Sequence, residues 1–117
     1  MSDFLRWFHS REREKGEKKQ QPPLEGDLVR ERIRFYGRVQ GVGFRYRAVY
    51  AARDLDCTGW VENELDGTVT MEVQGREEAI EKLLLSLSDG SWIEITDIER
   101  EEIPVDPKER DFRVRGY

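Results

Sequence analysis

Apolar and polar side chains alternate along five stretches of the chain, which is the pattern of β-strands with one buried face. The clearest stretch lies between residues 28 and 39, where Ile33, Phe35 and Val39 alternate with arginine and tyrosine side chains. This period of two predicts a half-buried strand. Further strands are predicted at residues 58–63, 68–74, 91–103 and 112–114, the last of them short.

Two other stretches carry apolar side chains at the spacing of an α-helix. The first predicts a helix from residue 44 that ends near residues 54–56, and the second predicts a helix over residues 76–88. The second helix has two glutamates in its first turn, where the helix dipole favours negative charge. The apolar positions are Phe44, Ala48, Ala51, Ala52 and Leu55 in the first helix, and Ile80, Leu83, Leu84 and Leu87 in the second.

The predicted elements follow in the order strand, helix, strand, strand, helix, strand, with the short fifth strand last. This order is that of a ferredoxin-like α+β sandwich, in which two helices cover one face of an antiparallel sheet. The Asp66-Gly67 pair predicts a hairpin turn between the second and third strands, and Gly75 is expected to end the third. The spacing of the isoleucines at 93–98 breaks the alternation of the fourth strand and indicates a β-bulge.

The first 26 residues differ from the rest of the chain. They contain a run of mixed charges and two prolines and have no apolar periodicity, so they are predicted to form a flexible N-terminal tail, with one domain over residues 27–117. An alternative is that Phe4, Leu5, Trp7 and Phe8 form a short amphipathic helix that docks on a partner or a membrane surface.

Composition narrows the class of protein. At 117 residues the chain has room for one domain, and it has no apolar run of the length that spans a membrane. Cys57 is the only cysteine, which excludes an internal disulfide and favours a cytoplasmic location; it is interpreted as a small core residue. His9 is the only histidine and lies in the predicted tail, so nucleophilic schemes with a histidine base have no candidate in the domain.

Topology brings two polar parts of the chain together. A right-handed crossover through the first helix makes the first two strands parallel, so both end on the same side of the sheet. The loop at residues 39–44 follows the first strand, and Asn63, the only asparagine, ends the second. Gly41 and Gly43 allow a ligand to approach the loop backbone closely, the helix that follows presents free N–H groups, and Arg45 is placed to clamp phosphate oxygens.

These features have simpler interpretations as well. The loop could be an ordinary tight turn, and asparagine is common where strands end for backbone reasons alone. The local charge favours an anionic ligand, because residues 30–53 contain seven arginines and a single acid, Glu31, although the whole chain has a net charge of -5. Asn63 would then hold a water in line with a bound phosphorus atom.

At this point the sequence resembles a known family, the acylphosphatases. Residues 37–45, Gly-Arg-Val-Gln-Gly-Val-Gly-Phe-Arg, are similar to the family signature G-x-V-Q-G-V-x-F-R, and residues 59–63 are similar to its second signature, G-W-V-x-N. The resemblance continues at residues 66–69, 73–75 and 112–115 and covers about residues 29–117. It departs at residues 91–94, where many relatives carry a basic or proline-containing stretch.

The resemblance implies a ferredoxin-like fold and hydrolysis of acyl phosphates to a carboxylate and inorganic phosphate, without a metal or other cofactor. It further implies that the loop backbone wraps the phosphate, that Arg45 binds the substrate and that Asn63 positions the attacking water. The expected partners are a small acyl phosphate and phosphate as product or inhibitor, with no nucleic acid, no membrane and a monomeric state. The backbone groups in question are those of Gln40, Gly41, Val42, Gly43 and Phe44.

Two alternatives compete with this interpretation. A non-catalytic module of the same fold could bind RNA or another polyanion through the arginine-rich stretch, but the third strand lacks the exposed aromatic side chains that such modules use. The chain could also act on carbamoyl phosphate, as the acylphosphatase-like segment of a larger maturation protein does. The absence of zinc-finger cysteines and of further domains speaks against this.

Overall fold

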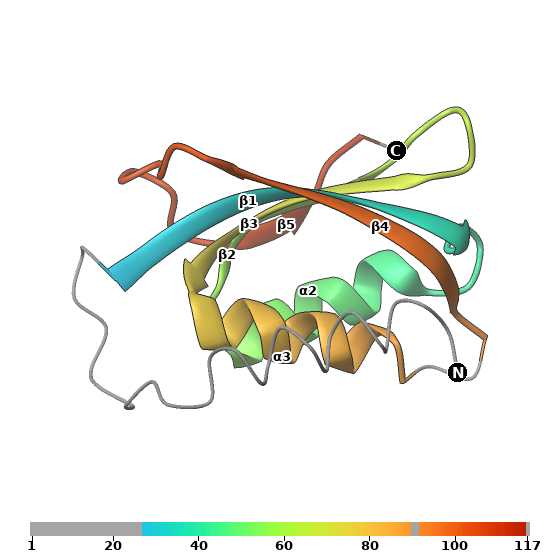
Figure 1. Ribbon diagram of the computed structural model, residues 1–117, viewed down its shortest axis with the longest axis horizontal. Helices are drawn as coiled ribbons and strands as arrows, with labels where there is room; N and C mark the ends of the chain where they lie inside the picture. The colour runs from blue at the N-terminus through green and yellow to red at the C-terminus, as the bar shows by residue number, and fades with distance from the viewer. Residues whose placement is uncertain (1–26, 90–91, 117) are drawn as a thin grey trace.

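The computed structural model describes residues 27–89 and 92–116, which form two layers, a twisted sheet and a pair of helices (Figure 1). Helices α2 (Phe44–Asp54) and α3 (Glu77–Leu87) lie on the same face of the sheet. The ferredoxin-like arrangement predicted from the sequence is therefore confirmed. The predicted tail lies outside the described residues, and no helix in the described part is long and apolar enough to cross a membrane.

The sheet has five strands in the order β4-β1-β3-β2-β5. The first four strands pair antiparallel, as predicted, but β5 runs parallel to β2, so the sheet is mixed. The reason lies in residues 104–111, which carry the chain from the edge strand β4 to the opposite edge and reverse its direction. The strands are β1 (Leu28–Arg38), β2 (Thr58–Asn63), β3 (Val69–Arg76), β4 (Glu94–Ile103) and β5 (Phe112–Val114).

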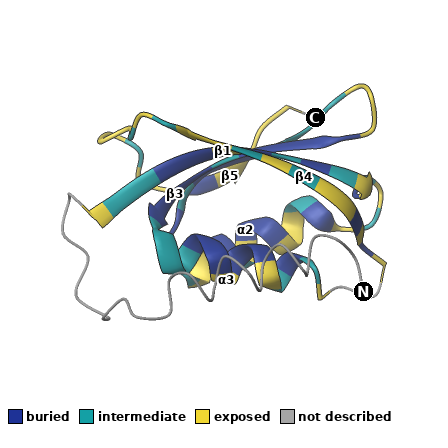
Figure 2. Ribbon diagram, in the orientation of Figure 1, coloured by how far each residue is buried: buried dark blue, intermediate teal, exposed yellow. Residues whose placement is uncertain are grey.

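The core lies between the sheet and the helices (Figure 2). The alternation in the sequence is reflected in burial, because Ile33 and Phe35 of β1 are fully buried whereas Arg32 is exposed. Cys57 is buried in this core, which confirms its interpretation as a small core residue, and burial raises the pKa of its thiol to about 12. The uncovered side of the sheet is called the open face below.

Two glycines in the strands show how close packing shapes the sheet. The predicted end of the third strand at Gly75 is wrong: β3 continues to Arg76, because Gly75 still pairs with Val29 and leaves room for the Cys57 sulfur. The predicted bulge in β4 is confirmed by a register shift opposite Tyr36 and Gly37. Gly37 has a φ of +117°, and a Cβ there would collide with the backbone of β4.

A buried ionic cluster joins the sheet to one of the helices. Arg100 of β4 contacts Glu31 of β1 at 2.6 Å and Glu81 of α3 at 2.9 Å, and all three side chains are at most 9% exposed. Burial alone would lower the pKa of Arg100, but hydrogen bonds from its guanidinium to the two glutamates outweigh that effect and raise it. The cluster therefore stays charged and fixes α3 against the edge of the sheet.

Candidate active site

The glycine loop, residues 39–43, connects β1 to α2. Gly41 and Gly43 have φ angles of +73° and +81°, while the residues between and before them have negative φ. Such alternation turns successive backbone N–H groups towards one side and forms a concave site for an anion. A Cβ at either glycine would meet no atom within 4 Å, so these positions require glycine for the backbone conformation and face open space.

The N-terminus of α2 extends this row of N–H groups. Gly43 caps the helix without any side-chain hydrogen bond, and its carbonyl accepts the first helical bond from the N–H of Arg47 at 3.0 Å. The N–H groups ahead of that bond have no acceptor within the helix and can bind an anion. Phe44 is buried and packs its ring edge-on against Phe35, with the centroids 4.9 Å apart, so Arg45 projects from a firmly held first turn.

Asn63 lies at the same end of the sheet as this loop, on a strand two positions away from β1. Phe35, Val69 and Asn63 are direct partners in one row of the ladder, so their side chains point to the same face, that of the helices. Two strand spacings separate β1 from β2, about 10 Å. The side-chain oxygen of Asn63 is buried and has no hydrogen-bond partner among the described residues, which is costly unless the oxygen serves another purpose.

Gln40 has a function in the structure that the sequence did not reveal. Its side-chain amide donates hydrogen bonds to the carbonyl oxygens of Glu64 at 2.7 Å and Thr68 at 2.8 Å. These acceptors belong to the turn that follows Asn63. The Gln40 side chain thus ties the glycine loop to the end of β2, and only its backbone remains for a ligand. A single long-range contact of this kind leaves no periodic signal in a sequence.

Several arginines of the arginine-rich stretch form ion pairs away from the glycine loop. Arg30 and Arg32 pair with Glu72 at 3.0 and 2.9 Å, and Arg53 pairs with Asp111 at 3.1 Å. The period of two in β1 sends Arg30, Arg32 and Arg34 to the open face, away from the helices. Of the seven arginines, Arg45 is the one in the first turn of the helix that follows the glycine loop.

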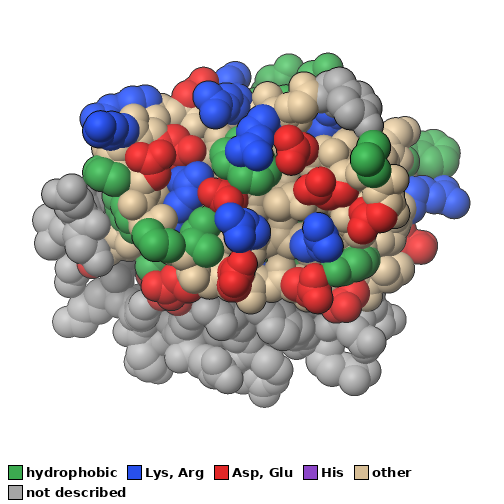
Figure 3. Space-filling view, turned by 90° about the horizontal axis from the view of Figure 1, so that it is seen from above, with side chains coloured by type: hydrophobic (Ala, Val, Ile, Leu, Met, Phe, Trp, Pro, Cys, Tyr) green, Lys and Arg blue, Asp and Glu red, His purple; other side chains and the backbone are tan. Residues whose placement is uncertain are grey.

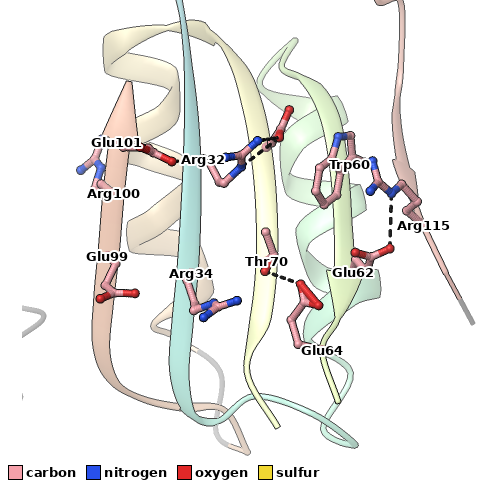
Figure 4. A pocket seen from close by; sticks show the side chains of 11 residues that line it. Arg32, Arg34, Trp60, Glu62, Glu64, Thr70, Glu99, Arg100, Glu101 and Arg115 are labelled. Atoms are coloured by element: carbon pink, nitrogen blue, oxygen red, sulfur yellow. Dashed lines mark hydrogen bonds and ion pairs between the residues drawn. The ribbon is translucent and has the colours of Figure 1, made fainter. Parts of the chain in front are cut away.

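A hollow of about 730 Å³ lies elsewhere, on the open face (Figure 4). Acidic and basic side chains intermingle over this face (Figure 3), and those around the hollow pair with one another, as Arg115 does with Glu62 at 3.3 Å. Arg115 also lies 3.9 Å above the ring of Trp60. Several of these charged groups are thus already satisfied by one another. The hollow is lined by Arg32, Arg34, Trp60, Glu62, Glu64, Thr70, Glu72, Glu99, Arg100, Glu101 and Arg115.

The described residues contain no group of three histidine, cysteine, aspartate or glutamate side chains placed to hold a metal ion. The residues predicted to form the site at the glycine loop carry backbone N–H groups, one guanidinium and one carboxamide instead. This set suits a small oxyanion.

Comparison with known proteins identifies the family. The acylphosphatase family model matches residues 31–114. The chain belongs to the acylphosphatase family. An acylphosphatase of Bifidobacterium longum is 43% identical over 91 residues, covering 76% of this chain and 94% of that protein. One from Geobacillus thermodenitrificans is 43% identical over 79 residues, covering 67% and 84% of the two chains. The family and the enzyme class predicted from the sequence are thereby confirmed.

Solved acylphosphatase structures share the fold. That of a Coxiella burnetii acylphosphatase has a TM-score of 0.72 at 32% identity and covers 81% of this chain and 100% of its own. A crystal structure of full-length HypF in a phosphate- and nucleotide-bound form has a TM-score of 0.71 at 29% identity, but the match covers 84% of this chain and only 13% of HypF. The similarity to HypF is therefore confined to one segment of that protein.

Proposed function

We propose that this member of the acylphosphatase family hydrolyses small acyl phosphates at the glycine loop, with Arg45 binding the phosphoryl group and Asn63 orienting the attacking water. The observation that carries the proposal is that two sets of polar groups that can bind a ligand lie at the same end of the sheet. One is a row of backbone N–H groups at the glycine loop and α2, and the other is the buried side-chain oxygen of Asn63, which has no partner in the described part of the chain.

The phosphoryl group would be bound by the backbone N–H groups of residues 40–44, the helix dipole and the Arg45 guanidinium. Phosphoryl transfer depends mainly on positioning and on stabilising charge over the three outer oxygens. A planar guanidinium can donate two parallel hydrogen bonds to these oxygens. Backbone donors held by the positive φ angles of Gly41 and Gly43 need no reorganisation during the reaction.

The water would be held by the Asn63 side chain. Its oxygen accepts a hydrogen bond from the water, whose own oxygen attacks phosphorus as the bond from phosphorus to the carboxylate oxygen breaks. The carboxylate is a stable leaving group, so no acid has to protonate it. The described residues contain no histidine, and we propose that the proton of the water passes to the bound phosphate.

A polyanion-binding module is less well supported. Proteins of related fold bind RNA on the open face of the sheet. Here that face presents five glutamates and three arginines around its hollow, and ion pairs join several of them. Arg100, which also borders the hollow, is paired with Glu31 and Glu81 towards α3. A surface of balanced charge attracts a polyanion weakly. We therefore propose that the chain acts without a nucleic-acid partner. From the family resemblance and the single cysteine we further propose that it acts as a monomer in the cytoplasm, without a membrane partner.

We also propose that residues 27–117 suffice for activity, because the match to the family model lies entirely within them. A variant that lacks residues 1–26 should then keep the kcat/KM of the full chain. A large loss of rate would assign a function to the N-terminal residues.

The test of the proposed function is hydrolysis of benzoyl phosphate by the purified full chain, with inorganic phosphate as a competitive inhibitor. The same preparation is titrated with labelled single-stranded RNA at low salt. Turnover that phosphate inhibits supports the enzyme. Salt-sensitive RNA binding without turnover would overturn it in favour of the binding module.

A further inference from the structure

Three large apolar side chains are strongly exposed near the glycine loop among the described residues. They are Trp92 at 73%, Leu65 at 95% and Tyr46 at 66% exposure. Each lies on a different element, namely the segment before β4, the turn after β2 and the first turn of α2. Apolar groups of this size at the border of a polar site are candidates for contact with the apolar part of a substrate.

The in-line geometry of phosphoryl transfer indicates which of the three side chains is placed to contact the acyl group. This inference rests on the proposed function. The attacking and the leaving oxygen stand on opposite sides of phosphorus. With the water held by Asn63 at the end of β2, the acyl group leaves on the side away from β2. The strand order β4-β1-β3-β2 places the glycine loop at the end of β1, so this side is that of β4.

Trp92 lies on the β4 side. Glu94, the first residue of β4, pairs with Arg38, the last residue of β1, so the chain just before β4 and the glycine loop leave the sheet at the same end (Figure 1). Ile93 is buried in the core and anchors the segment, while its neighbour Trp92 remains exposed. An aromatic side chain on an anchored backbone can contact a ligand at little cost in conformational entropy.

Leu65 and Tyr46 are less well placed to contact the acyl group. Leu65 belongs to the turn that follows Asn63 and therefore lies on the side of the attacking water. Tyr46 comes two residues after the buried Phe44, about 200° around the helix, and so points away from the sheet. We infer that Trp92 contacts the acyl group and gives the enzyme a preference for acyl phosphates with a large apolar or aromatic acyl part.

The experiment compares kcat/KM for benzoyl phosphate and acetyl phosphate in the full chain and in the variants Trp92→Ala, Trp92→Phe and Leu65→Ala. Aromatic contacts of this kind correspond to about threefold to tenfold in kcat/KM. We expect Trp92→Ala to lose that factor for benzoyl phosphate and to stay within about twofold of the wild type for acetyl phosphate. Trp92→Phe should restore most of the loss, and Leu65→Ala should leave the ratio of the two substrates unchanged.

The outcomes separate this inference from the proposed function. If the wild type hydrolyses both substrates and Trp92→Ala has the wild-type ratio, Trp92 does not contact the acyl group. A selective loss in Leu65→Ala would place the acyl group on the opposite side and overturn the inference as well. If the wild type hydrolyses neither substrate, the proposed function itself fails, and the inference with it. Circular dichroism and thermal unfolding check that each exposed substitution keeps the fold.

Discussion

The open face of the sheet and the end of the sheet at the glycine loop differ in how their polar groups are satisfied. On the open face, Arg32 pairs with Glu72 at 2.9 Å, and the hydroxyl of Thr70 donates to Glu64 at 2.6 Å. At the glycine loop the donors are backbone N–H groups at a helix start without a side-chain cap, and the buried side-chain oxygen of Asn63 has no partner within residues 27–89 and 92–116.

This difference separates two uses of polar residues in one small domain. Ion pairs on a surface contribute little individually and mainly fix the register of strands that already pair. Unmet donors and acceptors are unfavourable in the free protein and are kept where a ligand completes them. The open face contains a hollow of about 730 Å³ and many charged side chains, yet we propose the glycine loop as the catalytic site.

The largest expected effect comes from the two side chains assigned to the reaction. Arg45→Gln and Asn63→Ala should each lower kcat/KM for benzoyl phosphate by about a thousandfold, since each removes a contact that orients or stabilises the transition state. Arg34→Gln on the open face is the matched control and should stay within about twofold of the wild type. An equal loss in all three variants would abolish the distinction between the two regions.

A glycine comparison tests the backbone conformation of the loop. Gly43 and Gly67 both have positive φ, +81° and +94°, and neither faces an atom within 4 Å, so alanine at either position costs about 1–2 kcal/mol of stability through strain alone. We expect Gly43→Ala to lose more than about tenfold in kcat/KM because the N–H groups shift, following the sensitivity of positioned groups to small displacements. Gly67→Ala should stay within about threefold.

Urea unfolding measures the strain in these two variants and initial rates measure the activity. Similar losses of stability with dissimilar rates would support the assignment of the loop. If Gly67→Ala were as inactive as Gly43→Ala, the loop backbone would have no special part in catalysis.

Two glutamines whose side chains hydrogen-bond to distant backbone groups offer a matched pair at opposite ends of the sheet. Gln40 clamps the glycine loop to the turn after β2, and Gln74 clamps residue 106, donating to its carbonyl at 2.9 Å and accepting from its N–H at 2.7 Å. Alanine at either position should cost about 1–3 kcal/mol, because buried partners lose their hydrogen bonds. Only Gln40→Ala should also lower kcat/KM, by about tenfold, as measured beside urea unfolding. A comparable loss in Gln74→Ala would point to general loosening of the fold.

The smallest effect concerns acid stability, to which the open face contributes. Burial acts to raise the pKa of the Glu72 carboxyl, but hydrogen bonds from Arg32 and Arg30 outweigh it and hold the pKa below its ordinary value of 4.5. A carboxyl with a lowered pKa in the folded state stabilises the fold above its ordinary pKa, and this stabilisation is lost as the pH falls through the lowered value.

We therefore expect the free energy of unfolding of the wild type to fall as the pH drops below 4.5, and to fall less steeply in Glu72→Gln. Urea unfolding between pH 3 and pH 7 measures this slope. Both proteins should have similar kcat/KM near neutral pH. Identical slopes would show that the ion pairs of the open face contribute nothing to acid stability.

The sequence by itself determined the helices and strands of the fold and the two segments proposed to form the active site, the glycine loop and the end of β2. The period of two and the helical period locate five strands and two helices, because burial on one face requires those spacings. The start of α2 at Phe44 and the end of β2 at Asn63 agree with the predicted bounds. Strand order then follows from the handedness of crossovers, so the meeting of Asn63 with the glycine loop needs no coordinates.

Only the tertiary structure decided which polar groups are already paired. Arg30 and Arg32 look like candidates for anion binding in a count of charges, but both pair with Glu72 on the open face. The glutamate partners lie about 40 residues or more away along the chain. The parallel pairing of β5 and the continuation of β3 through Gly75 likewise depend on residues that are distant in the sequence. Such contacts depend on how separate segments pack, which no local pattern records.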